Sequence, residues 1–133
     1  MIPFSLETAD MEGKILTNWP RHSGEFKIVQ MEVEGSLFIL FGPDSEFHSA
    51  LIMEFLRRFP DRPVHTVKGE FDNVYPALEG GWYKVWGAGK ALANKEKREL
   101  IFYGRSKAYD IGISREHLER IRQMKPAWKM RFE

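Results

Sequence analysis

The hydrophobic pattern divides the chain into short apolar runs and two stretches with helical spacing. Residues 26–33 and 36–41 are rich in β-branched and aromatic side chains, which predicts two strands. The Glu34-Gly35 pair between them is short enough for a hairpin. In residues 45–59 an apolar side chain recurs every four positions, which predicts a helix that ends before a proline-rich turn.

The rest of the pattern predicts further strands and a second helix. Ser114 is placed to cap that helix, Glu116 falls in its first turn, and Pro126 ends it. Clean alternation over residues 128–132 predicts a closing strand with one buried face. The other expected strands are residues 64–67, 75–78, 82–86 and 100–103, and the expected loops are residues 87–90 and 104–112.

This order, β-β-α-β-β-β-α-β, predicts an α/β (α+β) fold. We expect a mixed sheet of about six strands flanked by two main helices, one on each side. The 133 residues suit a single domain spanning 1–133. Residues 1–23 show no regular pattern and are expected to form an irregular N-terminal extension.

The segment that begins the first predicted helix carries candidate chemistry. Asp44 or Ser45 is a plausible N-cap, and Glu46 suits the positive end of the helix dipole. His48 then falls in the first turn, at the edge of the sheet, where free backbone N–H groups point outward. The pattern therefore predicts an anion site with a titratable base beside it, although a first-turn histidine is more often a solvated or capping residue.

Two other segments offer groups for the same anion. By two-residue alternation Lys27 shares a strand face with apolar residues, so its ammonium group either snorkels out at the strand end or clamps a phosphate. The loop from Tyr103 to Tyr109 carries a hydroxyl, two cations and backbone N–H groups. Such a loop forms either an anion-binding nest or an ordinary polar connector.

Composition and charge narrow the classes of function. The net charge is +1, so no bulk attraction to DNA or membranes is implied. There is no cysteine, which excludes disulfides, thiolate metal sites and a cysteine nucleophile. No signal-peptide pattern and no apolar run of membrane-spanning length occurs, so we expect a cytoplasmic protein that does not bind membranes.

Several motifs fail or stay weak. Residues 87–90 suggest a phosphate-binding P-loop, but Lys84 stands where its first glycine belongs and Ala91 replaces the required Ser or Thr. The four histidines have no zinc-site spacing, so no metal is expected. Trp82, Tyr83 and Trp86 with nearby lysines allow a weaker reading as a platform for single-stranded RNA.

Four segments in this order resemble the Janus/Ocnus family, which includes the protein phosphohistidine phosphatases. The likeness covers about residues 24–132; each motif is weak by itself, but four in this order are fairly specific. Residues 103–109 are similar to the family's signature Tyr-Gly-x-Ser-x-Ala-Tyr. The other matching segments are the lysine-bearing strand at 24–29, the histidine-bearing segment at 39–50 and the glycine-rich turn at 87–90.

The resemblance implies a metal-independent phosphatase, without cofactors, that hydrolyses the P–N bond of phosphohistidine or phospholysine. It implies His48 as the catalytic residue, either as a general base on water or as the attacking nucleophile. The residues it implies for substrate binding are Lys27, Ser49, Lys90, Ser106, Lys107 and Ala108. The expected partner is a phosphorylated protein or a small phosphoramidate, with no nucleic acid, and the chain is expected to be a monomer.

Three positions depart from the family pattern. Lys90 stands for the usual Arg, so a bidentate phosphate fork becomes a point charge. Ser49 replaces an Ala, and Asp110 replaces a Gly and would oppose a phosphorylated ligand if it faced the site. These changes leave an alternative function open, a phosphate- or phosphoprotein-binding module of the same fold without turnover.

Overall fold

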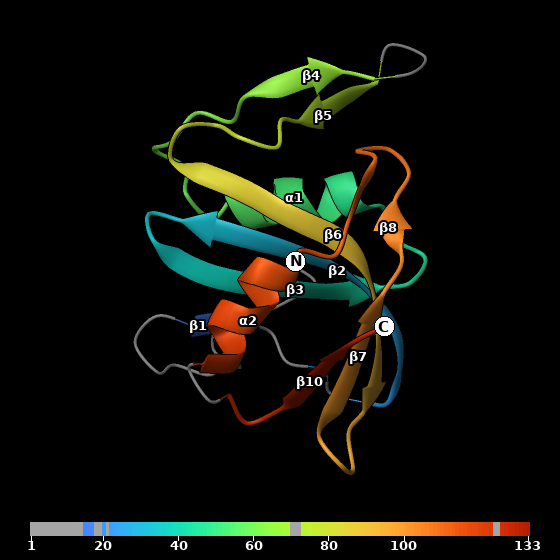
Figure 1. The fold of residues 1–133 in the computed structure, drawn as a ribbon. Helices are drawn as coiled ribbons and strands as arrows, with labels where there is room; N and C mark the ends of the chain where they lie inside the picture. Colours follow the sequence, from blue (N-terminus) through green and yellow to red (C-terminus); the bar gives the residue numbers. More distant parts are fainter. Residues whose placement is uncertain (1–14, 18–19, 21, 70–72, 124–125) are drawn as a thin grey trace.

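The fold was examined in a computed structural model, which describes residues 15–17, 20, 22–69, 73–123 and 126–133 (Figure 1). Its helices are α1 (His48–Leu56) and α2 (Arg115–Gln123). Its strands are β1 (Ile15–Thr17), β2 (Gly24–Val33), β3 (Ser36–Pro43), β4 (Thr66–Lys68), β5 (Val74–Pro76), β6 (Tyr83–Asn94), β7 (Glu99–Tyr103), β8 (Arg105–Ser106), β9 (Ile111–Gly112) and β10 (Lys129–Phe132).

The main sheet has six strands in the order β1-β3-β2-β6-β7-β10. Its two outer pairs, β1 with β3 and β10 with β7, are parallel, and the central pairs are antiparallel. Two small two-stranded sheets, β4-β5 and β8-β9, complete the described strands. The predicted α+β class with a mixed sheet is confirmed.

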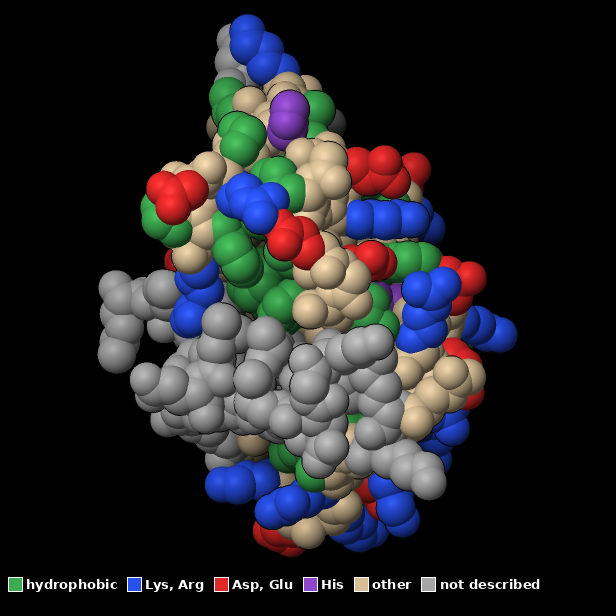
Figure 2. All heavy atoms as spheres, turned by 90° about the vertical axis from the view of Figure 1, so that its left-hand side faces the viewer, with side chains coloured by type: hydrophobic (Ala, Val, Ile, Leu, Met, Phe, Trp, Pro, Cys, Tyr) green, Lys and Arg blue, Asp and Glu red, His purple; other side chains and the backbone are tan. Residues whose placement is uncertain are grey.

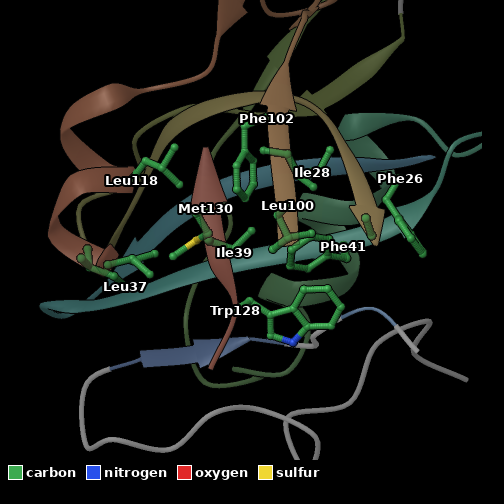
Figure 3. Close-up of a cluster of buried hydrophobic side chains, with 13 residues drawn as sticks. Phe26, Ile28, Leu37, Ile39, Phe41, Leu100, Phe102, Leu118, Trp128 and Met130 are labelled. Atoms are coloured by element: carbon green, nitrogen blue, oxygen red, sulfur yellow. The ribbon is translucent and has the colours of Figure 1, made fainter. Parts of the chain in front are cut away.

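Each face of the sheet is covered by one helix, as predicted. On one face Leu118 and Ile121 of α2 pack over a cluster that includes Ile28 and Phe102 (Figure 3). On the other face Leu51 and Phe55 of α1 pack over residues such as Val29 and Leu40. Alternation along β2 explains this division, because neighbouring residues of a strand point to opposite faces.

The hairpin between β2 and β3 forms where the sequence places it. Glu34 and Gly35 both have positive φ angles, 49° and 87°, as a two-residue type I′ turn requires. The start of α2 is also as predicted, because the Ser114 hydroxyl accepts a hydrogen bond from the His117 N–H at 3.2 Å. Both features depend on local chemistry that the sequence displays directly.

The predicted start of the first helix is wrong. The α1 helix begins at His48 instead of residue 45, and its N-cap is Phe47, with no side-chain cap from Asp44 or Ser45. Glu46 accepts the Phe47 N–H on its own side chain and stays outside the first turn. Phe47, expected on the apolar helix face, is therefore extended and 71% exposed.

The predicted loop at residues 87–90 is also wrong, because these residues lie inside the twelve-residue strand β6. Glycine is required at positions 87 and 89 because other segments of the chain approach the β6 backbone closely. A Cβ on Gly89 would lie 2.7 Å from the Tyr103 carbonyl oxygen, and one on Gly87 would lie 2.7 Å from the Ser114 nitrogen. Glycine in this strand serves close packing and not a turn.

Two smaller expectations need correction. Residues 1–23 were expected to be irregular, but β1 pairs with β3 at Ile15–Thr17; residues 1–14, 18–19 and 21 lie outside the described part. The expected loop at 104–112 contains the β8-β9 pair. The strands expected at 64–67 and 75–78 are shifted to β4 and β5, which pair only with each other in the described structure.

Candidate functional site

The site is built on one row of residues that crosses the main sheet. Lys27 of β2 is paired with Gly42 of β3 on one side and with Lys90 of β6 on the other. Lys90 is paired in turn with Tyr103 of β7. Directly opposed residues project from the same face, so the side chains of Lys27 and Lys90 both leave the sheet on the α1 face, where neighbouring like charges are unfavourable without a counter-charge.

The α1 helix places His48 over this row. The imidazole is 8% exposed, and its Nε2 lies 2.8 Å from the Gly89 carbonyl oxygen. Because a carbonyl only accepts, Nε2 carries the proton in the neutral ring and Nδ1 keeps its lone pair. The strand glycine therefore sets the tautomer and leaves one nitrogen available as a base.

The surroundings of His48 favour the neutral imidazole. Burial lowers its pKa below 6.5, and the positive charges of Lys27 and Lys90 lower the pKa further, against an opposing effect of the Gly89 hydrogen bond. The main cause is the removal of the ring from water, which penalises its charged form.

The two lysines differ in their partners. The Lys90 ammonium group lies 3.2 Å from Asp44 and 3.3 Å from Glu25, and hydrogen bonds to these carboxylates raise its pKa. Tyr103 donates to the same Glu25, and burial together with this bond raises the pKa of Tyr103 to about 12. Lys27 instead lies over the Phe47 ring, 5.7 Å from its centroid.

The turn after β7 supplies the hydroxyl. Gly104, with φ of 78°, lets the chain turn into β8, where Ser106 is 1% exposed. The Ser106 hydroxyl accepts the Tyr109 N–H at 3.4 Å, which orients it. In the described part of the chain the N–H groups of Lys107 and Ala108 have no hydrogen-bond partner, so they are free to bind an anion.

One pocket of about 710 Å³ collects these groups. Every residue that the sequence analysis assigned to the site lines it: Lys27, His48, Ser49, Lys90, Ser106, Lys107 and Ala108. In Figure 1 the end of β3, β8 and the start of β5 lie on the same side of the molecule, around this region. The pocket thus draws on segments far apart in the sequence.

The pocket also contains residues that the sequence analysis did not assign to it. These are Asp44, Phe47, Asn73, Val74, Tyr75 and Arg105. The cations of the loop around Arg105 were a sequence signal for an anion site. Residues 73–75 carried no such signal, because their place in the pocket depends on where the β4-β5 hairpin packs. Among the described lining residues there are four Lys or Arg side chains and one carboxylate, so the pocket favours anions.

The departures from the family pattern can now be located. Asp110 does not line the pocket; its carboxylate binds Arg105, and its φ of 55° is a conformation that the family's glycine adopts at no cost. The carboxylate that would oppose a bound anion is instead Asp44. Lys90, in place of Arg, is held by Asp44 and Glu25.

Other sites are less suited to chemistry. A hollow of about 340 Å³ between α2 and β10 contains three arginines, of which Arg122 pairs with Glu119 and Arg115 stacks on Phe132. It holds no histidine or hydroxyl, so we consider the larger pocket the candidate site. Within the described residues no group of His, Asp and Glu side chains is arranged to bind a metal, and no helix is long and apolar enough to cross a membrane.

The three aromatic residues considered for RNA stacking do not form one platform. Tyr83 is 3% exposed, Trp82 packs on the α1 side of the sheet, and Trp86 contacts His117 of α2 on the other side. Figure 2 shows basic and acidic side chains mixed on the face that it presents, with no continuous basic area. The three rings therefore do not form the common stacking surface that RNA binding would need.

Comparisons with protein-family models and with curated proteins found no match to this sequence. The likeness to the Janus/Ocnus family therefore depends on the four motifs alone and stays a prediction.

Proposed function

We propose that this chain is a metal-independent phosphohydrolase that cleaves the P–N bond of phosphohistidine, with His48 as the general base. One observation carries the proposal: a buried neutral imidazole, two opposed lysines and a buried serine, from four separate elements, line a single anion-favouring pocket. Phosphoryl transfer needs mainly placement of the reacting groups and neutralisation of oxygen charge, and this set of residues is suited to both.

In the proposed reaction the phosphoryl oxygens bind Lys27, the Ser106 hydroxyl and the free N–H groups of Lys107 and Ala108. The N–H groups of His48 and Ser49 in the first helical turn add to this anion site. His48 Nδ1 removes a proton from water, and the water oxygen attacks phosphorus as the P–N bond breaks. The departing imidazole nitrogen takes up a proton from solvent, and the products are phosphate and histidine.

A test compares hydrolysis of a phosphohistidine peptide by the wild type and His48→Ala, with and without a chelator. We expect the variant to lose roughly a hundredfold to ten-thousandfold in rate, because a general base contributes roughly 10² to 10⁴. Chelator is expected to have no effect. His65→Ala is the matched control, since His65 is exposed and does not line the pocket. Equal turnover by His48→Ala, with an unchanged circular dichroism spectrum, would refute the proposal.

A second candidate is a phosphate-recognition module without turnover. The observation that favours it is the engagement of Lys90 with Asp44 and Glu25, which leaves less positive charge for the transition state. Phosphate binding by titration calorimetry, with no release of phosphate from the peptide over several hours, would support this candidate over the enzyme.

A further inference from the structure

Exposed apolar side chains gather at the pocket. Within the described residues four large apolar side chains are exposed: Phe47 at 71%, Val67 at 48%, Val74 at 58% and Leu92 at 46%. The two most exposed, Phe47 and Val74, both line the pocket, and the other two do not. Apolar groups that stay in water beside a polar site are typical of a surface that binds a partner.

The apolar side chains that line the pocket come from two elements. Phe47 stands at the start of α1, with the Lys27 ammonium group 5.7 Å from its ring centroid. Val74 and Tyr75 come from β5, and the Tyr75 ring lies 6.1 Å from that of Tyr109. The pocket is therefore lined by three apolar or aromatic side chains, which we call the rim (Phe47, Val74 and Tyr75), together with the charged groups around His48.

The size of the pocket also exceeds what a phosphoryl group requires. Its volume of about 710 Å³ is that of sites that take ligands of roughly drug size, whereas a phosphoryl group has only five heavy atoms, counting the atom that bears it. The remaining space must fit the carrier of the phosphoryl group. Three of the side chains lining that space are apolar or aromatic.

We propose that the rim binds an apolar side chain next to the phosphorylated residue, so that the site selects peptide segments of that kind. This inference rests on the proposed function for the position of the phosphoryl group. A peptide is the carrier we choose because the rim and the proposed phosphate-binding groups line the same concave pocket, which admits a side chain next to the phosphorylated residue but not the flat surface of a membrane.

The experiment uses two phosphohistidine peptides that differ only next to the phosphorylated residue, with leucine in one and glycine in the other. For the wild type we expect the KM of the glycine peptide to exceed that of the leucine peptide by about tenfold, a typical value for one buried apolar contact. In Val74→Ser and Phe47→Ser the ratio of the two KM values should fall toward one. Val67→Ser and Leu92→Ser, at exposed apolar positions outside the pocket, should keep the wild-type ratio.

The outcomes separate the inference from the proposed function. Hydrolysis of both peptides with the same ratio in Val74→Ser as in the wild type overturns the inference and leaves the phosphatase intact. If the wild type hydrolyses neither peptide, the phosphatase proposal fails. The rim is then tested in the same variants by the ratio of the dissociation constants of the two peptides, measured by fluorescence anisotropy. Binding to phosphatidylserine vesicles that is lost in Val74→Ser, with equal affinity for the two peptides, would assign the rim to a membrane and overturn the inference.

Discussion

At the scale of single residues, the chemistry of the site is set by the hydrogen bond of His48 to Gly89 and by the two carboxylate partners of Lys90. The Gly89 carbonyl fixes the proton of His48 on Nε2, and burial keeps the ring neutral. Lys90 is held by two carboxylates, whereas Lys27 has no carboxylate partner among the described residues. The two opposed lysines are therefore unequal, and Lys27 is the cation more readily available to an anion.

The pH dependence of hydrolysis should report the imidazole of His48. A base acts in its neutral form, and burial lowers the pKa of His48 below 6.5. We therefore expect the rate to stay constant as the pH falls through 6.5 and to decline only at lower pH. In Lys27→Met the acid limb should move to higher pH, because a positive charge that lowers the pKa is removed. A decline of the wild-type rate that already begins at or above pH 6.5 would contradict the assignment of His48 as the base.

Removing the pocket carboxylate should strengthen phosphate binding. Asp44→Asn takes a negative charge from the lining and frees Lys90 from one of its partners. We expect the dissociation constant of inorganic phosphate, measured by calorimetry, to fall about fivefold, equivalent to about 1 kcal/mol for one charge near water. Asp61→Asn is the control, since Asp61 is exposed and does not line the pocket. A similar change in both variants would count against the assignment of Asp44.

At the scale of elements, a buried polar contact joins α2 to the centre of the sheet. The Gln30 side chain accepts the Ser114 N–H at 2.7 Å and donates to the Ser114 carbonyl at 2.9 Å. His117 donates from Nε2 to the Met31 carbonyl at 2.9 Å, which leaves Nδ1 to accept from Gln30. Both side chains are fully buried, so this contact fixes the position of α2 by polar complementarity.

This contact should make folding stability sensitive to acid. Burial lowers the pKa of His117 to about 4, because a proton on Nδ1 would face the Gln30 amide in a dry site. The unfolded chain takes up that proton near pH 6.5, so the free energy of unfolding should decrease as the pH falls from 6.5 through 4. The full effect is on the order of 3 kcal/mol.

The measurement is urea unfolding at pH 7 and pH 4 for the wild type and His117→Gln. Glutamine keeps a donor for Met31 but does not titrate in this range. The loss of unfolding free energy between pH 7 and pH 4 should therefore be smaller in the variant, by up to about 3 kcal/mol. An equal difference in both proteins would show that His117 does not carry the acid sensitivity.

At the scale of the whole molecule, the candidate site draws on segments that lie far apart in the sequence. Its lining comes from β2, the start of α1, β5, β6 and the turn after β7. A ligand that binds several of these elements at once binds only the folded chain. Occupation of the pocket should therefore stabilise the whole fold.

Inorganic phosphate should raise the melting temperature of the wild type. At a hundred times the dissociation constant the gain is about 2.7 kcal/mol, which corresponds to several degrees for a domain of this size. Lys27→Ala and Ser106→Ala should show a smaller rise in a calorimetric scan, and chloride at equal ionic strength is the control. A rise that is the same in these variants and in the wild type would place phosphate binding elsewhere.

Much of the fold can be predicted from the sequence because local chemistry specifies it. Neighbouring residues specify the turn at Glu34-Gly35 and the Ser114 cap. They also give each helix an apolar side, which packs on one face of the sheet. The misplaced loop at residues 87–90 shows the limit of this reasoning. Its glycines suggested a turn, but they are needed because the chain near Tyr103 and Ser114 approaches the strand.

The sequence by itself determined which side chains are available for the proposed chemistry and which face of its strand Lys27 occupies, since alternation depends only on the order of residues. Only the tertiary structure decided that Lys27 stands opposite Lys90, that Gly89 holds the His48 proton, and that Phe47 and Val74 border the same pocket. These relations depend on strand register and on the packing of distant segments, which no short stretch of sequence contains.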